Sequence, residues 1–154
     1  MSRGPEFYSA AYGIFKDKDG KILFMQRQGS GFYDGFYQIP AGHIEGEESV
    51  IDCFVREMKE ELDVDLIKEN LDVVHTSHRI SIGRVYFDFY VEVKDFDITK
   101  IKINEPNKCS AINFFDINSI SNYDEKFIGY DIEIIKMIEK GVTFSEISIK
   151  NYNK

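Results

Sequence analysis

Residues 42–64 read GHIEGEESVIDCFVREMKEELDV, a polar loop with two glycines followed by a segment of helical periodicity. Apolar residues recur at a spacing of three and four, which predicts an amphipathic helix over residues 49–62. Glu57, Glu60 and Glu61 occupy positions i, i+3 and i+4 of this helix. They are therefore expected to project from one flank, beside the apolar surface that faces the core.

Three like charges in this arrangement repel one another, and near a helix C-terminus the macrodipole also disfavours them. A divalent cation compensates such repulsion, since Mg²⁺ and Mn²⁺ prefer oxygen ligands and share carboxylates readily. On the helix alone, a second interpretation remains open. The same residues can form a solvated acidic face in which Arg56 and Glu60 make an ordinary i,i+4 ion pair.

The whole stretch resembles the Nudix box, GX5EX7REUXEEXGU, where U is a bulky aliphatic residue. Eight of the nine specified positions match, with every spacing kept: Gly42, Glu48, Arg56, Glu57, Met58, Glu60, Glu61 and Val64. The one departure is Asp63, where the box has glycine. That position follows a helix end and favours a left-handed backbone, which Asp and Asn tolerate best among the other residues. The substitution touches no expected metal ligand and is not interpreted as a loss of activity.

The resemblance implies an α/β/α sandwich with a mixed β-sheet. It implies that Glu57, Glu60 and Glu61 bind Mg²⁺ or Mn²⁺, joined by the backbone carbonyl of Ala41. It further implies a bracing pair between Glu48 and Arg56, and a sharp backbone turn beside the metal at Gly42.

The implied reaction is attack of water on a phosphorus of a diphosphate in a nucleoside triphosphate or another nucleoside-diphosphate derivative. The metal would neutralise charge, orient the substrate and lower the pKa of the water. The general base varies within the family, and the candidate outside the box is Glu105, in the segment Ile103 to Cys109. Some Nudix proteins carry a similar Glu-Pro-x-Lys-Cys segment. The alternative, a solvated loop glutamate, stays open.

Residues that bind the substrate are harder to identify from the sequence. Arg27 precedes a glycine-rich loop and is the candidate for a phosphate contact, with a plain surface arginine as the alternative. Tyr37 and Phe87 are candidates for stacking on a nucleobase, although strand aromatics more often pack in the core. No histidine has a metal-ligand spacing.

Composition limits the remaining possibilities. The 154 residues suit one domain over residues 1–154, with residues 1–5 interpreted as a tail that is either native or a cloning remnant. The net charge of −8 disfavours nucleic-acid polymers and anionic membranes as partners. No apolar run approaches a membrane span, and two cysteines without ligand spacing favour free thiols. The expected partner is a small nucleotide-like molecule, the expected location is the cytoplasm, and a homodimer is an open possibility.

Periodicity and turn residues also predict the other elements of a single α/β domain. The first two predicted strands are expected to pair as a hairpin around the polar turn at residues 16–21. A closing helix is expected to end at Gly141. The predicted strands are residues 7–15, 22–27, 36–39, 73–80, 85–93 and 111–117, and the predicted helices are residues 49–62 and 125–140.

Two other functions on the same fold were considered. A nucleotide-sensing domain without catalysis often loses box glutamates, and this chain keeps all of them. Isomerisation of an isopentenyl diphosphate requires protonation of a carbon, and no residues for that chemistry are recognisable. Hydrolysis is therefore the leading interpretation.

Overall fold

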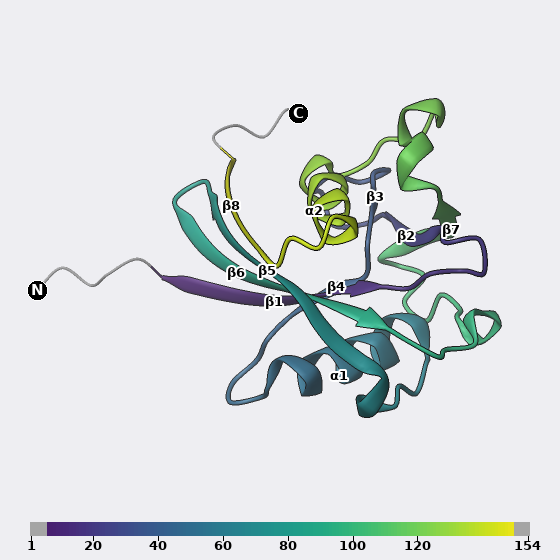
Figure 1. Cartoon of the computed structure of the whole chain (residues 1–154), viewed down its shortest axis with the longest axis horizontal. Coiled ribbons are helices and arrows are strands. Elements are labelled where there is room, and N and C mark those ends of the chain that lie inside the picture. Colours follow the sequence, from purple (N-terminus) through teal and green to yellow (C-terminus); the bar gives the residue numbers. More distant parts are fainter. Residues whose placement is uncertain (1–5, 150–154) are drawn as a thin grey trace, which may run out of the picture.

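The computed structural model describes residues 6–149, which form two β-sheets with a long helix on each side of the larger sheet (Figure 1). This arrangement confirms the predicted α/β class with a mixed sheet. The elements, in chain order, are β1 Phe7–Ile14, β2 Ile22–Arg27, β3 Tyr37–Gln38, β4 Ala41–His43, α1 Val50–Leu62, β5 Leu71–Ser81, β6 Arg84–Val93, β7 Cys109–Phe115, α2 Gly129–Glu139 and β8 Phe144–Ile149. The tail assigned to residues 1–5 lies outside the described residues.

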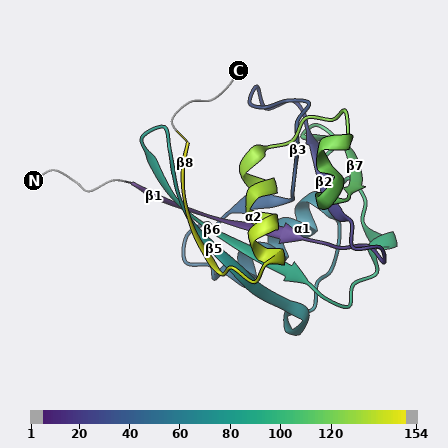
Figure 2. The same ribbon diagram turned by 45° about the horizontal axis from the view of Figure 1, so that its top comes forward.

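The larger sheet has the strand order β4-β1-β6-β5-β8. It is mixed, because β1 runs parallel to β6 and β5 runs parallel to β8, whereas the β1–β4 and β5–β6 pairs are antiparallel. The smaller sheet is antiparallel in the order β3-β2-β7. Turning the molecule shows α2 in front of the larger sheet and α1 behind it (Figure 2).

The predicted hairpin between the first two strands is wrong. β1 pairs with β4 and β6, whereas β2 is the central strand of the smaller sheet, and only an isolated bridge at Lys16 and Ile22 links the two. The physical reason is burial on both faces of β2. Phe24 belongs to one hydrophobic cluster and Leu23 to the other, and a simple hairpin would leave one of these side chains in water.

Two short strands were not anticipated. β4 lies within a stretch interpreted as loop, because Ala-Gly-His shows no strand alternation. β8 lies beyond Gly141, where the prediction stopped, and its outer side chains are exposed at the sheet edge. The closing helix begins at Gly129 rather than Glu125, because residues 126–128 run extended against β3.

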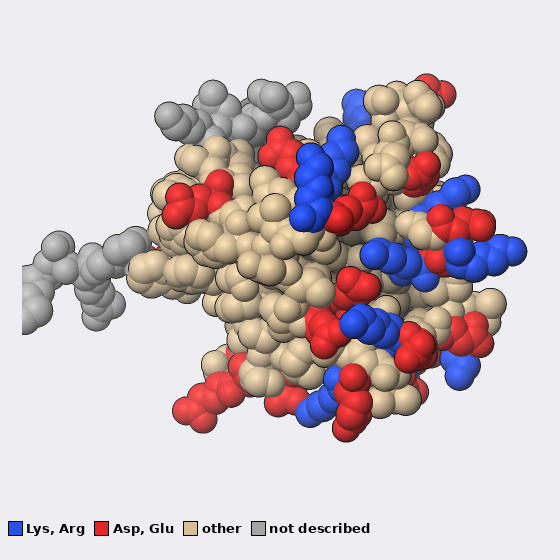
Figure 3. Space-filling model, in the orientation of Figure 1, with Lys and Arg blue, Asp and Glu red and all other residues tan. Residues whose placement is uncertain are grey.

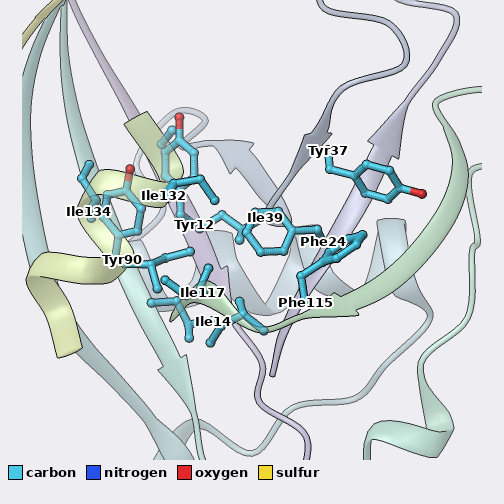
Figure 4. Packing of buried hydrophobic residues seen from close by; sticks show 13 residues of the cluster. Tyr12, Ile14, Phe24, Tyr37, Ile39, Tyr90, Phe115, Ile117, Ile132 and Ile134 are labelled. Atoms are coloured by element: carbon cyan, nitrogen blue, oxygen red, sulfur yellow. The ribbon is translucent and has the colours of Figure 1, made fainter. Parts of the chain in front are cut away.

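The core consists of two clusters on opposite faces of the larger sheet. One lies between that sheet, the smaller sheet and α2, and includes Tyr12, Phe24 and Phe115 (Figure 4). The other lies under α1, where Phe54 and Met58 are fully buried. This second cluster anchors the helix that carries the box glutamates. No helix among residues 6–149 is long and apolar enough to cross a membrane.

Candidate active site

The box helix α1 is capped at both ends. At its start, the Ser49 side chain accepts a hydrogen bond from the backbone N–H of Asp52 at 3.1 Å. At its end, Asp63 adopts φ 53° and ψ 41°, the left-handed conformation expected at this position, and its N–H donates to the carbonyl of Lys59. The Asp63 carboxylate lies 3.0 Å from both Lys59 and Lys102. Aspartate thus replaces the box glycine without altering the helix end.

Arg56 links α1 to the preceding loop. Its guanidinium donates to Glu48 at 2.6 and 3.1 Å and to the carbonyl of His43 at 3.2 Å. The bidentate bonds from Arg56, with a further bond from the N–H of Glu45, lower the pKa of Glu48 to about 2. Glu48 is therefore a charged brace at neutral pH, and it fixes the loop over residues 43–48 on the helix.

The three box glutamates lie in different surroundings. Glu60 is half-exposed and lies 3.3 Å from Arg56. The Glu57 side chain is only 13% exposed and accepts from Arg56 at 2.9 Å, and burial raises its pKa. For Glu61, desolvation of the carboxyl group and repulsion from Glu57 and Glu105 raise the pKa to about 8. Desolvation and repulsion disfavour the charged form of this carboxyl group, and a bound cation would stabilise it.

Gly42 is fitted to the Glu57 carboxyl group. A Cβ atom at Gly42 would lie 2.0 Å from Cδ of Glu57, far inside contact distance. The register of β4 against β1 holds Gly42 opposite Ala11 and leaves Ala41 one residue before this contact. The β4 backbone and the Glu57 carboxylate therefore share one small space, which only glycine leaves open.

A cavity of about 310 Å³ brings the expected chemistry together. Its lining includes three candidate residues, Ala41, Glu61 and Glu105, together with Arg27 at the end of β2. Its lining joins four separate parts of the chain: β2 with the glycine-rich loop, the β3–β4 segment, the end of α1 and the loop over residues 105–109. The structure thus places the distant candidate Glu105 beside a box glutamate.

The segment that carries Glu105 is attached to the end of α1. Asn104 donates its backbone N–H to the carbonyl of Glu61 and its side-chain amide to the carbonyl of Glu60, each at 3.0 Å. These bonds satisfy carbonyls that a helix end leaves without partners. Glu105 itself lies 3.2 Å from Lys108 and is 29% exposed. Glu105 is therefore held close to the box glutamates through the backbone.

The residues present fit a hard divalent cation, although their carboxylates do not converge fully. Within residues 6–149, no group of three His, Cys, Asp or Glu side chains is close enough to enclose an ion. Glu57 turns toward Arg56 and Glu60 toward solvent. The candidate ligand atoms are nevertheless all oxygens, which hard divalent cations prefer. The carboxyl group of Glu61 is desolvated, and the absence of a side chain at Gly42 lets the Glu57 carboxylate lie beside the β4 backbone.

A larger cavity of about 950 Å³ opens on the α2 side of the sheet. Aromatic rings from the larger sheet, the glycine-rich loop and α2 surround it, among them Tyr12, Tyr86 and Tyr130. The Arg79 guanidinium lies over the Tyr86 ring at 4.0 Å and the Tyr130 ring at 4.9 Å. Four basic side chains and one glutamate line this cavity, in a chain whose net charge is −8. Its chemistry suits a molecule with both aromatic and anionic parts.

Two expected substrate contacts are corrected by the structure. Tyr37 is 5% exposed, its ring lies 5.1 Å from that of Phe115, and its hydroxyl accepts from Asn113, so it is a core residue. Phe87 lies on the opposite face of β6 from the cavity, stacked on Phe7 at 5.8 Å. Because side chains alternate along a strand, Tyr86 faces the cavity instead.

Arg27 lines both cavities, but its guanidinium already has partners. It donates to the carbonyl of Phe32, to the Gln38 side chain and to Ser30, at 2.8 to 3.1 Å. Its position between the two cavities agrees with a phosphate contact, and its bonds also brace the glycine-rich loop.

Sequence reasoning missed the buried pair of Arg79 and Asp88. The two side chains form bonds of 2.6 and 3.2 Å, and their exposed fractions are 8% and 0%. A signal was present, since both charged residues stand at strand positions that share a face with Tyr86 and Tyr90. Charges on the inner face of a predicted sheet indicate a functional or specific pairing.

Asp131 is a second buried acid that the sequence did not single out. It lies in the first turn of α2, and its Oδ2 accepts from the backbone N–H of Ile39 at 3.2 Å. Burial raises the pKa of Asp131 to about 7. The folded protein therefore retains a proton that the unfolded chain releases above its ordinary pKa of about 3.8.

Because of this raised pKa, the free energy of unfolding is expected to fall as the pH rises from about 4 to about 7. Above about pH 7, Asp131 should cause no further decrease. Asp131→Asn is expected to remove this loss and to raise Tm at pH 8. Thermal unfolding at pH 4.5, 6 and 8 measures it, with Asp65→Asn as an exposed control. Equal slopes of Tm against pH in wild type and Asp131→Asn would contradict the prediction.

The surface shown in Figure 3 carries interspersed acidic and basic side chains, without a continuous basic stripe. Together, the fold and the site define an α/β protein with a mixed sheet, in which the acidic helix α1 ends at a small cavity. A larger cavity with an aromatic and basic lining adjoins it, and Arg27, Gln38 and Ala41 line both.

Comparison with known families matches residues 7–135 to the NUDIX domain. The chain belongs to the Nudix family, which confirms the resemblance seen in residues 42–64.

Individual relatives agree with this assignment. An ADP-ribose pyrophosphatase from Methanocaldococcus jannaschii is 29% identical over 105 residues, which are 68% of this chain and 59% of that protein. The chain therefore spans 59% of the length of this relative. A MutT protein from Methanosarcina mazei shares the fold with a TM-score of 0.75 at 13% identity, over 90% of this chain and 97% of that one. The E. coli ORF135 protein gives 0.71 at 23% identity, over 88% and 91% of the two chains.

Proposed function

We propose that this chain hydrolyses a diphosphate linkage in a small nucleoside-diphosphate derivative, with Mg²⁺ or Mn²⁺ bound by Glu57, Glu60, Glu61 and the carbonyl of Ala41. One observation carries the proposal. Glu57 is packed against the Gly42 backbone. The desolvated Glu61 lines one cavity beside Ala41, and Glu105 lines the same cavity. Repelling carboxyl groups held together in this way suit a cation and the anion that it binds.

When bound, a divalent cation supplies charge neutralisation, orientation of the diphosphate and a more acidic water. The residues of the chain provide the remainder. Glu48 and Arg56 keep the box loop rigid, and Arg27 and Lys108 place positive charge at the small cavity. Glu105 stands beside Glu61 at that cavity, in position to accept a proton from an attacking water.

The larger cavity supports a nucleoside-diphosphate derivative as the substrate. About 950 Å³ lies at the upper end of the usual range for small-molecule sites. Its aromatic and basic lining suits a base stacked on a ring and an anionic group near an arginine. Because one relative is an ADP-ribose pyrophosphatase, ADP-ribose is the first substrate to assay.

The test is a turnover screen of purified protein against ADP-ribose, nucleoside triphosphates, nucleotide sugars and dinucleoside polyphosphates. Phosphate or nucleotide release is expected with Mg²⁺ or Mn²⁺ and is expected to stop in excess EDTA. Turnover that persists in EDTA would remove the proposed metal site. Tight binding of a nucleotide without any release would instead indicate the non-catalytic sensing domain.

Glu105→Gln is expected to lower kcat by about 10²-fold or more, because a general base contributes about 10²–10⁴ to the rate. The acidic limb of the pH–rate profile should change as well, since that limb reports titration of the base. Glu69→Gln is the matched control, because it removes one carboxylate from an exposed position that lines neither cavity. An unchanged rate and profile in Glu105→Gln would return Glu105 to the role of a solvated loop residue.

A further inference from the structure

Two segments far apart in the sequence are bound together beside the active site. The N–H of Tyr37 donates to the carbonyl of Lys126 at 2.7 Å, and the N–H of Ile128 donates to the carbonyl of Tyr37 at 3.0 Å. Asp131 then accepts from the N–H of Ile39. β3 and the start of α2 accordingly lie next to each other in both ribbon views (Figures 1 and 2).

These segments face different parts of the site. Residues 126–130 form one wall of the larger cavity. Ile39 leads through Pro40 to Ala41, which lines both cavities. Because proline has no N–H, the N–H of Ile39 is the last backbone donor before Ala41. On both sides of Ala41, β1 also holds this segment, because the N–H of Gly13 donates to the carbonyl of Pro40 at 2.8 Å and Gly42 pairs with Ala11. The bond to Asp131 at Ile39 is the attachment of the same segment to α2.

Burial of the Asp131 carboxyl group is energetically unfavourable. Asp131 is 1% exposed, and its Oδ1 has no hydrogen-bond partner within residues 6–149. Ile39 is fully buried, so without Asp131 its N–H would be left unsatisfied, at a cost of about 1–3 kcal/mol. Packing alone poorly explains a buried carboxyl group in which one oxygen accepts a hydrogen bond and the other has no partner among the described residues.

We propose that Asp131 is a positioning residue for the metal site. By holding the N–H of Ile39, it acts together with the bond from Gly13 to Pro40 to fix the segment that leads into Ala41, and so contributes to the position of the Ala41 carbonyl. The wall of the larger cavity and the metal site are thereby joined through one buried side chain. This inference rests on the proposed function, because it requires a cation at Ala41 and the box glutamates.

The experiment measures Mn²⁺ binding to the substrate-free protein by electron paramagnetic resonance, together with amide exchange of Ile39 by NMR. Asp131→Ala is expected to weaken Mn²⁺ binding about tenfold or more, in the range found for residues that orient metal ligands. Exchange at the Ile39 amide should accelerate in the same variant. Asp131→Asn keeps an oxygen acceptor and is expected to retain nearly full Mn²⁺ affinity.

Ser145→Ala is the matched control, since it removes a buried hydrogen bond to His75, 2.8 Å long, between β5 and β8. It should lower stability without changing Mn²⁺ affinity. Equal affinity in wild type and a folded Asp131→Ala variant would overturn the inference and leave the proposed function standing. Loss of affinity in Asp131→Asn comparable to the alanine variant would also overturn it. This second criterion applies even if Asp131→Ala fails to fold. A wild type that binds no Mn²⁺ would refute both proposals.

Discussion

Glu61→Gln is expected to lower kcat for diphosphate hydrolysis by about 10²–10³-fold, because it removes a proposed ligand of the cation that would stabilise transition-state charge. Glu60→Gln is expected to act in the same direction. The stability of the two variants should differ. Burial and repulsion raise the pKa of Glu61 to about 8, so a neutral amide there relieves an unfavourable charge above that pH. Glu61→Gln should therefore combine this lowered kcat with a stability at pH 9 at least equal to that of wild type.

Steady-state rates and thermal unfolding, measured on the same preparations, test this result. Glu69→Gln is the control, since Glu69 is exposed in the 3₁₀ turn Lys68–Asn70, outside the residues that line either cavity. Wild-type turnover in both Glu60→Gln and Glu61→Gln would eliminate the box helix as the metal site. A loss of activity accompanied by unfolding would show a structural role instead.

Gly42→Ala is expected to have the second-largest effect. The new methyl group would lie 2.0 Å from Cδ of Glu57 and 2.4 Å from one carboxylate oxygen, so the carboxyl group must leave its position. Displacing it breaks the bond to Arg56 and moves a proposed metal ligand away from the β4 backbone. Mn²⁺ affinity should fall about 10–100-fold, the range found when support for metal ligands is lost.

Gly129→Ala is the matched control for metal affinity. A Cβ atom at Gly129 would meet nothing within 4 Å, and this residue does not have a positive φ. Alanine at this first helical position should leave Mn²⁺ binding unchanged and slightly raise Tm, because it has the higher helix propensity. Unaltered metal binding in Gly42→Ala would mean that Glu57 can act from another position, against the close fit seen here.

The features that the sequence predicted well are local ones. The box helix, its left-handed end at Asp63 and the pair between Glu48 and Arg56 depend on residues at most eight positions apart. The two strands of the β5–β6 pair were also predicted, as residues 73–80 and 85–93, although their pairing was not. Such features are encoded by spacing and by turn chemistry, which one sequence displays directly.

The errors concern relations between distant segments. The sequence of β2 carries no local signal that it pairs with β7, more than 80 residues away, rather than with β1. Tyr37 and Phe87 failed as substrate contacts because the choice between core and cavity depends on which face another sheet covers. The bond from Ile39 to Asp131 spans 92 residues and has no local signature. These features follow from packing, which becomes visible only once the sheets are assembled.

The double bond from Asn104 to the end of α1 also bears on how this chain can change in length. Insertions or deletions at the 3₁₀ turn Ile98–Lys100 lie ahead of that attachment and between the core contacts of Phe96 and Ile101, so they should alter the surface without moving Glu105 relative to Glu61. A single added residue between Asn104 and Glu105 would shift the carboxyl group by about 3.5 Å, a full residue step along an extended chain. Natural variation in loop length is therefore expected to accumulate at residues 98–100 and to be absent from residues 104–105.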